Sequence, residues 1–185
     1  AAATAAQEAR CEVEAASGID FPNSYQGLAF AGAGVRIKYI FVKVYAVGFY
    51  VDAGDVAHLK GASEDAVATA LLSTGLSKVI RIVMARTLSS EKYTAAIVEA
   101  LDPRVKDKAA LARFQDMNPP GDMRQGTEIC MELRGDTLYY MIGGRAIGSI
   151  QSEELTAALA DVYFGSDPVS PPARADACKR ISAGL

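Results

Sequence analysis

One stretch of the sequence, residues 32–52, constrains the fold more than any other. It opens with Gly32-Ala33-Gly34, and glycines can turn tightly because they have no Cβ. A dense run of β-branched and aromatic residues follows, as is typical of strands. Its members are Val35, Tyr39, Ile40, Val42, Val44, Tyr45, Val47, Phe49, Tyr50 and Val51. Apolar and polar residues do not alternate cleanly here. We therefore predict strands covered on both faces, with helices on one side and more protein on the other.

Two cations interrupt this apolar stretch, Arg36 soon after the glycines and Lys43 in its middle. A guanidinium beside a tyrosine can hold an anion in an apolar site, because its planar donors match a carboxylate. The alternative is a cation at a strand end whose head reaches solvent, as long cationic side chains often do. The residue types make Arg36 a candidate ligand contact and leave that alternative open. We also expect Gly34, at the turn that presents Arg36, to tolerate substitution poorly.

The composition limits the classes of function. The 185 residues are enough for one domain with a proper core, and we assign residues 10–185 to it, after an alanine-rich lead at residues 1–9. With 19 basic and 22 acidic residues the net charge is −3, which disfavours a nucleic-acid partner because that would require a basic face. No stretch of about 18 apolar residues is free of charge, so we expect no transmembrane segment.

The cysteines and the histidine predict neither a disulfide framework nor a metal site. Cys11, Cys130 and Cys178 lie far apart, and His58 is the only histidine. We therefore expect no metal and no cofactor. Scattered thiols in an odd number fit a reducing compartment.

The hydrophobic pattern beyond the central stretch predicts both strands and helices. Strands are expected at residues 10–15, 26–30, 78–86, 126–133, 137–142 and 145–150. Helices are expected as two short segments within 55–73, then from Ser89 or Ser90 to residue 101, and at 105–116, 152–165 and 171–183. Strands and helices segregate more than they alternate. This favours an α+β fold, with a mainly antiparallel sheet and helices on one face.

Several motifs, taken in their order along the chain, resemble the chalcone isomerase superfamily. They are GIDFP at 18–22, GAGVR at 32–36, FVKVYAVGFYVD at 41–52, RIVM at 81–84 before Tyr93, and DVYFG at 161–165 leading into PVSP at 168–171. The ordered set is specific, although no single motif is. The superfamily holds true chalcone isomerases, plant fatty-acid-binding relatives of the plastid, and bacterial chalcone-isomerase-like proteins. The resemblance implies the chalcone isomerase-like fold, which agrees with the α+β prediction.

The resemblance also implies which positions would form an isomerase site. Such an enzyme uses an arginine for the substrate anion, matched here by Arg36, and a helix tyrosine, matched by Tyr93. The lysine and asparagine expected further along that helix fall on Ala96 and Ala100, and a late threonine falls on Val162, with Tyr163 beside it. Methyl groups cannot donate to a developing oxyanion, and losing one good donor costs about 2.7–4 kcal/mol of barrier. We therefore disfavour an isomerase, which stays a distant third possibility.

The position of the sheet threonine favours a different branch, because it is occupied by Tyr45. In the fatty-acid-binding relatives, a tyrosine in a KVYA motif joins the arginine to hold a carboxylate, and residues 43–46 read KVYA. The turn between Arg36 and Tyr45, around Lys38-Tyr39-Ile40, is shorter than expected in the plant proteins and more like the bacterial relatives. Tyr45 could instead be a core tyrosine with a backbone partner, and Tyr93 a tyrosine of the helix surface or rim.

Two hypotheses of function remain. The first is a non-catalytic protein that binds a fatty acid or similar amphipathic anion, with Arg36 and Tyr45 at its head group and Tyr93, Val162 and Tyr163 along the cleft. The second is a structural or accessory subunit of a larger protein assembly, whose cleft is filled by its own side chains. An open apolar pocket of about 300 Å³ or more beside Arg36 would favour the first.

The location of the protein is a further expectation. The chain starts at Ala1, which suits either an artificial start or a mature terminus left after a targeting peptide was removed. With the resemblance to plastid proteins, the second possibility predicts the plastid, in the stroma or associated with the thylakoid.

Overall fold

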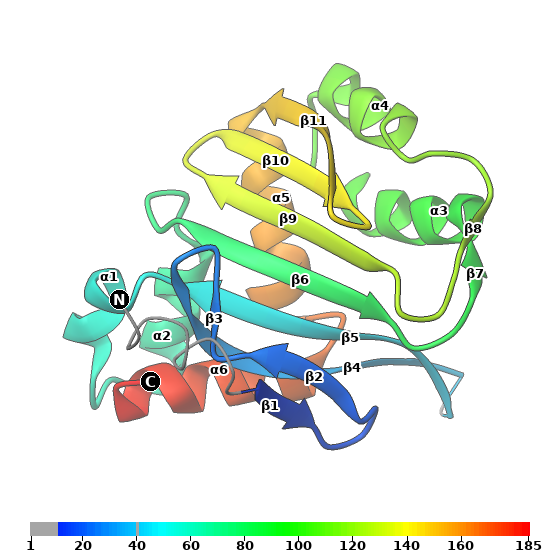
Figure 1. Ribbon diagram of the computed structural model, residues 1–185. Coiled ribbons are helices and arrows are strands. Elements are labelled where there is room, and N and C mark those ends of the chain that lie inside the picture. Colours follow the sequence, from blue (N-terminus) through cyan, green and yellow to red (C-terminus); the bar gives the residue numbers. More distant parts are fainter. Residues whose placement is uncertain (1–10, 40) are drawn as a thin grey trace, which may run out of the picture.

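The computed structural model describes residues 11–39 and 41–185, so the expected lead at residues 1–9 lies outside the described residues. A curled antiparallel sheet of seven strands, in the order β11-β10-β9-β6-β5-β4-β3, forms the body of the fold (Figure 1). Its strands are β3 Ser24–Tyr25, β4 Leu28–Lys38, β5 Val42–Val51, β6 Lys78–Met84, β9 Glu128–Arg134, β10 Thr137–Ile142 and β11 Arg145–Gln151. Two smaller ribbons pair β1 Cys11–Glu14 with β2 Ile19–Pro22, and β7 Leu88–Ser89 with β8 Asp122–Met123.

Most of the helices begin just after a residue whose side chain accepts a backbone N–H group of the first turn. They are α1 Ala53–Val56, the 3₁₀ turn η1 Ala57–Leu59, α2 Glu64–Leu72, α3 Ser90–Leu101, α4 Lys108–Asp116, α5 Glu153–Phe164 and α6 Pro171–Ala183. The Ser89 hydroxyl accepts the Lys92 N–H and caps α3, which confirms one of the two expected caps. Helices α2, α5 and α6 pack together behind the sheet (Figure 1), so the predicted α+β fold with helices on one face is confirmed.

The role first assigned to the glycines at the start of the central stretch is wrong. Gly32 and Gly34 lie inside β4 and not in a turn. A Cβ on Gly34 would lie 2.4 Å from the Ala173 nitrogen, and one on Gly32 would lie 2.6 Å from the Ala177 nitrogen. These glycines therefore let the backbone of α6 lie directly on β4. The close approach leaves no room for a Cβ at Gly34, which gives a physical reason for the prediction that this residue tolerates substitution poorly.

The opposite face of β4 and β5 is covered by the β1–β2 ribbon. Phe21 of β2 lies directly over Gly48, where a Cβ would come within 2.3 Å of its ring. Phe21, Phe30 and Tyr50 form a second buried cluster on this face, separate from the main core under the helices. The prediction of strands covered on both faces is confirmed, because β5 is buried without interruption from Tyr45 to Val51.

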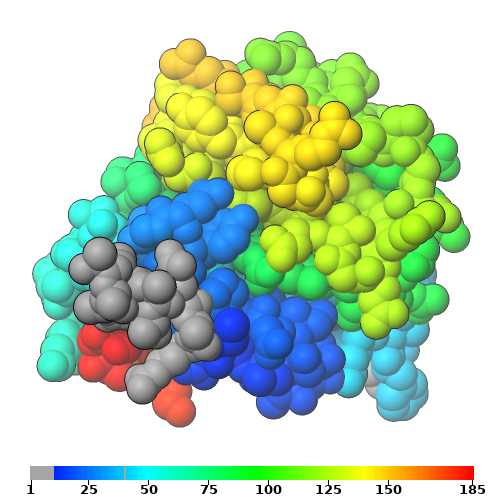
Figure 2. Space-filling view, in the orientation of Figure 1, coloured from blue at the N-terminus to red at the C-terminus, as the bar shows by residue number. Residues whose placement is uncertain are grey.

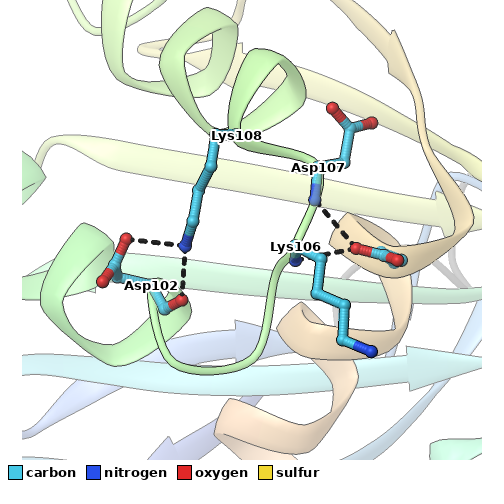
Figure 3. A network of polar contacts seen from close by, with 5 residues as sticks. Asp102, Lys106, Asp107 and Lys108 are labelled. Atoms are coloured by element: carbon cyan, nitrogen blue, oxygen red, sulfur yellow. Dashed lines mark hydrogen bonds and ion pairs between the residues drawn. The ribbon is translucent and has the colours of Figure 1, made fainter.

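Polar contacts fix α4 against its neighbours (Figure 3). A carboxylate oxygen of Glu154, at the start of α5, accepts the backbone N–H groups of Lys106 and Asp107 at 2.8 and 2.9 Å. The Lys108 ammonium lies 2.9 Å from the Asp102 carboxylate, just after α3 (Figure 3). Asp107 caps α4, so this helix begins at Lys108, later than the expected residue 105. Within the described part of the chain, no helix is long and apolar enough to cross a membrane.

Candidate functional site

A cavity of about 480 Å³ lies at one end of the sheet, between the free end of the β4–β5 hairpin and α3. Its described lining residues are Arg36, Lys38, Tyr39, Val42, Val44, Tyr45, Arg86, Leu88, Lys92, Tyr93, Ala95, Ala96 and Glu99. The hairpin, the segment that follows β6, and α3 meet here because β4 and β6 end, and β5 begins, on the side of the sheet where α3 begins (Figure 1). The cavity exceeds the size that the binding hypothesis requires.

Arg36 and Tyr45 are direct partners across the β4–β5 ladder, so their side chains share one face of the hairpin. The Arg36 guanidinium carbon lies 5.7 Å from the centre of the Tyr45 ring. Among the residues that the structure describes, no carboxylate forms an ion pair with this half-buried cation. Burial opposes its charge, but the neighbouring phenols of Tyr45, Tyr163 and Tyr93 outweigh burial and raise the pKa of Arg36 above its ordinary value. Arg36 therefore presents an uncompensated positive charge to the cavity.

Buried tyrosines surround the inner end of this site. Tyr45, Tyr93, Tyr140 and Tyr163 are all almost completely buried. Burial raises the pKa of Tyr93 and of Tyr163 well above the usual range, so both phenols are neutral donors at physiological pH. The Tyr140 hydroxyl donates to the Asn118 side-chain oxygen at 2.8 Å, whereas the Tyr93 hydroxyl has no described partner. A buried hydroxyl without a partner is unfavourable, and a ligand oxygen or a water would relieve it.

The structure brings three of the five predicted site residues together. Arg36, Tyr45 and Tyr93 all lie on the cavity wall. Val162 and Tyr163 are buried in α5, outside the described lining, and the Tyr163 ring packs edge-on against Phe49 with 6.1 Å between centroids. Tyr163 still influences the site, because its phenol lies near enough to Arg36 for each to affect the other's pKa. The role of these five residues as ligand contacts stays a prediction.

The charged rim of the cavity was not predicted from the sequence. Lys38, Arg86 and Lys92 join Arg36 in the lining, and Glu99 is the one carboxylate among the described lining residues. Arg86 and Lys92 come from separate elements, so no local sequence motif unites them with Arg36. The one feature of the sequence that could have indicated this rim is the absence of Asp and Glu from residues 21–51. Four cations against one anion favour an anionic ligand.

A second cavity, of about 750 Å³, has the opposite charge. It lies between α3 and the end of α4, and four carboxylates line it, those of Glu91, Glu99, Asp102 and Asp116. Neither lysine nor arginine occurs among its described lining residues, so this cavity would repel an anion. The described residues also contain no cluster of three or more His, Cys, Asp or Glu side chains suited to a metal ion. An anionic ligand would therefore select the cavity beside Arg36.

Comparison with known proteins agrees with this architecture. The family model described as chalcone isomerase-like matches residues 13–175. The chain belongs to the chalcone isomerase-like family. A comparison with curated protein sequences finds no match. Among solved structures, a fatty-acid binding protein of Arabidopsis thaliana superposes with a TM-score of 0.83 at 21% sequence identity, over 95% of this chain and 98% of that one. This likeness shows that the two proteins share the chalcone isomerase-like fold.

Proposed function

We propose that this protein binds a fatty acid or a similar amphipathic anion in the cavity beside Arg36, without catalysing a reaction on it. The observation that carries the proposal is the unpaired, half-buried guanidinium of Arg36 on the wall of an open cavity of about 480 Å³. Ligand cavities of soluble proteins have volumes of about 300–1,000 Å³, so the space suits a small amphiphile. The fold that this family member shares with a fatty-acid binding protein supports the same ligand class.

The two ends of such a ligand would make different contacts. Arg36 and the Tyr45 hydroxyl would hold the carboxylate, and charge-assisted hydrogen bonds of this kind contribute roughly 1.5–3 kcal/mol each. Val42, Val44 and Leu88 supply apolar lining for the tail. Burial of a tail contributes about 0.8 kcal/mol per methylene, so the tail would give most of the affinity and Arg36 the orientation.

The residues at the positions of the isomerase site disfavour isomerase activity. Ala96 lies on the cavity wall and Val162 is buried in α5, at positions where the family resemblance implies polar donors. Neither side chain can hydrogen-bond to a developing oxyanion. Tyr93 and Arg36 alone would provide little of the charge stabilisation that such a reaction requires.

An accessory subunit of a larger, plastid assembly is the second candidate. It is favoured by one observation: Tyr45, Tyr93 and Tyr163 are nearly fully buried and fill the inner end of the cleft with the protein's own side chains. In this second candidate function, the surface of the protein would bind the other subunits, and the cleft would bind no ligand. The cavity that stays open beside Arg36 is the reason that we place the binding function first.

Native mass spectrometry followed by a titration distinguishes these candidates. We expect the protein purified from its source to carry a small amphiphile, and the delipidated protein to take up one equivalent of palmitate at micromolar concentration in calorimetry. If the native protein instead appears as a lipid-free component of a larger complex and palmitate gives no binding heat, the binding proposal fails and the accessory role takes its place.

A further inference from the structure

The tip of the β4–β5 hairpin exposes an unusual amount of apolar surface. Ile37, Tyr39 and Phe41 are 48%, 81% and 85% exposed, and they lie within five positions of one another. The other large exposed hydrophobic side chains among the described residues, at positions 13, 139 and 185, are scattered along the chain. Single exposed apolar residues are ordinary, but a cluster of them marks an interaction surface.

The backbone presents this cluster away from the body of the protein. Strand β6 pairs with β5 only as far as Tyr45 and Met84, whereas β4 and β5 continue to the Lys38–Val42 pair. The hairpin therefore extends past its neighbour in the sheet (Figure 1) and forms a corner of the molecule (Figure 2). Tyr39 has a φ of 51°, in the left-handed region that aromatic residues seldom adopt. Its side chain is 81% exposed, and backbone conformations that cost energy occur often at functional sites.

Positive charge accompanies the apolar cluster. Lys38 and Lys43 lie on the tip, and the Lys38 ammonium is 5.8 Å from the centre of the Tyr39 ring. The nearby cavity rim adds Arg86 and Lys92. None of these four cations forms an ion pair with a carboxylate in the described ranges, 11–39 and 41–185. The chain as a whole carries a net charge of −3, so the positive charge is a local feature of this end.

We propose that the tip of the β4–β5 hairpin docks this protein on the surface of an anionic membrane. Aromatic rings favour the boundary between lipid head groups and acyl chains, and lysines beside them attract anionic lipids. A second copy of the chain is a poorer occupant, because it would bring two cationic tips together. Lys38 and Tyr39 belong both to the tip and to the cavity lining. Docking would therefore turn the cavity beside Arg36 toward the bilayer.

A vesicle flotation experiment tests the apolar contact. The protein is mixed with vesicles of phosphatidylcholine containing phosphatidylglycerol, and separately with pure phosphatidylcholine vesicles. We expect binding to the anionic vesicles and at least tenfold weaker binding to the neutral ones. Ile37→Ser combined with Phe41→Ser should abolish binding, while Val13→Ser combined with Tyr139→Ser, a matched loss of exposed apolar surface elsewhere, should leave it unchanged. Ile37 and Phe41 are not among the described residues that line the cavity, so palmitate affinity should not change in the tip variant.

A second pair of variants tests the charge. Lys38→Gln should weaken binding to the anionic vesicles about fivefold, the effect of one lysine near a charged bilayer. Lys106→Gln, which removes an exposed lysine from the segment before α4, should have no effect. Raising the salt concentration should weaken the wild type in the same direction as the Lys38 substitution.

Insertion itself can be observed directly, because the chain contains no tryptophan. Phe41→Trp introduces a single reporter, whose emission should shift to the blue and be quenched by brominated lipid when anionic vesicles are added. The proposal is overturned if the wild type does not bind anionic vesicles, or if the Ile37 and Phe41 double variant binds them as well as the wild type. It is equally overturned if the tryptophan emission neither shifts to the blue nor is quenched by brominated lipid. It is also overturned if the tip instead causes concentration-dependent dimerisation in the absence of lipid. None of these readouts requires that the cavity bind a fatty acid, so they are independent of the proposed function.

Discussion

Gly34 sets how closely α6 approaches the sheet. Because it has no side chain, the backbone of α6 at Ala173 lies where a Cβ would be, and Ser170, just before the helix, donates from its hydroxyl to the Val35 carbonyl at 2.7 Å. A helix in such direct contact with a strand cannot adapt to even one added methyl group without moving its backbone. The cost of a substitution here therefore measures the contact between α6 and β4.

We predict that Gly34→Ala lowers the free energy of unfolding by about 2 kcal/mol or more, and Gly34→Val by still more, because each would force Ala173 away from β4. Gly75→Ala is the control, since its Cβ would make only an ordinary contact, 3.4 Å from the Ser73 hydroxyl. Denaturant unfolding of the three variants provides the test. Equal stability of the Gly34 and Gly75 variants would show that α6 does not need this close approach.

The Gly-Ala-Gly pattern alone did not distinguish a turn from a close approach, since both favour a residue without a Cβ. The partner that decides between them, Ala173, is far away in the sequence. Only the folded chain shows that the two segments meet.

Lys78 is a buried cation with a measurable effect on stability. Its ammonium donates to the Ser73 carbonyl at 2.7 Å, and burial lowers its pKa to about 8. In the unfolded chain a lysine has a pKa of about 10.4, so between these two values the unfolded state binds more protons than the folded state. The penalty for burying the charge is therefore fully present below about pH 8 and is relieved as the pH rises toward 10.

We predict that the free energy of unfolding of the wild type, relative to that of Lys78→Met, increases by about 3 kcal/mol at most between pH 8 and pH 10.4. Urea unfolding at several pH values within this window provides the measurement. Subtracting the values for Lys78→Met cancels the contributions that other titrating groups make to the pH dependence of the free energy of unfolding. A constant difference between the two proteins across the window would show that the Lys78 ammonium is not desolvated.

At the scale of elements, α3 connects the fold to the site. Its side chains form one wall of the cavity beside Arg36 and also one wall of the acidic cavity. Tyr93 lies on its first turns, close to the end that Ser89 caps. Fraying of that end would displace Tyr93 before it affected the rest of the helix.

We predict that Ser89→Ala lowers stability by about 1 kcal/mol, the usual loss for a capping side chain, and weakens palmitate binding several-fold. Ser63→Ala is the matched control, because Ser63 caps α2 with the same type of hydrogen bond and α2 lines neither of these two cavities. Thermal unfolding and calorimetry should show similar stability losses for both variants and an affinity loss for Ser89→Ala alone. Equal affinity losses would mean that α3 does not position the site.

The elements themselves were largely predictable, because their signals are local. Hydrophobic periodicity located α3, α5 and α6, and a serine one position before α3 marked its start. Starting α4 at residue 105 was wrong because the Asp107 carboxylate caps the helix by accepting the Ala110 N–H, and the Glu154 carboxylate, from another helix, accepts the backbone N–H groups of Lys106 and Asp107 that precede it. A tertiary partner of this kind leaves no local pattern.

At the scale of the whole molecule, tyrosines with raised pKa values determine how the free energy of unfolding changes above about pH 10. Burial raises the pKa values of Tyr25, Tyr50, Tyr93, Tyr140 and Tyr163 above the ordinary value. Above pH 10 the unfolded chain would release these protons while the folded chain retains them. The stability that depends on neutral phenols is therefore fully present below about pH 10 and is lost as the pH rises further.

We predict that the protein unfolds cooperatively between about pH 10 and pH 12, with each buried tyrosine lowering the free energy of unfolding by roughly 1.4 kcal/mol per pH unit. Tyrosinate absorbance and circular dichroism should therefore change together. Gradual ionisation of all the tyrosines with the secondary structure intact would contradict the burial of these five phenols.

The candidate site was predictable only in part. The resemblance to the chalcone isomerase superfamily singled out Arg36, Tyr45 and Tyr93. They lie on one cavity wall because two of them pair across one hairpin and the third is on α3. The cationic rim and the burial of Val162 and Tyr163 were not foreseen. Both depend on where α3 and α5 lie against the sheet, which is set by packing over the whole core.

The proposed function depends above all on Arg36, which would hold the anionic end of the ligand. Calorimetric titration of the wild type and of Arg36→Met, each with palmitate and with the uncharged alcohol hexadecanol, tests it most directly. Methionine keeps most of the bulk of the stem and removes the charge. Arg145→Met, at an exposed position outside the described cavity lining, is the control.

We predict that Arg36→Met weakens palmitate binding by about tenfold or more, the equivalent of about 1.4 kcal/mol, and leaves hexadecanol binding almost unchanged. Arg145→Met should change neither. Equal losses for acid and alcohol, or no loss for either, would contradict the claim and show that Arg36 does not contact the head group.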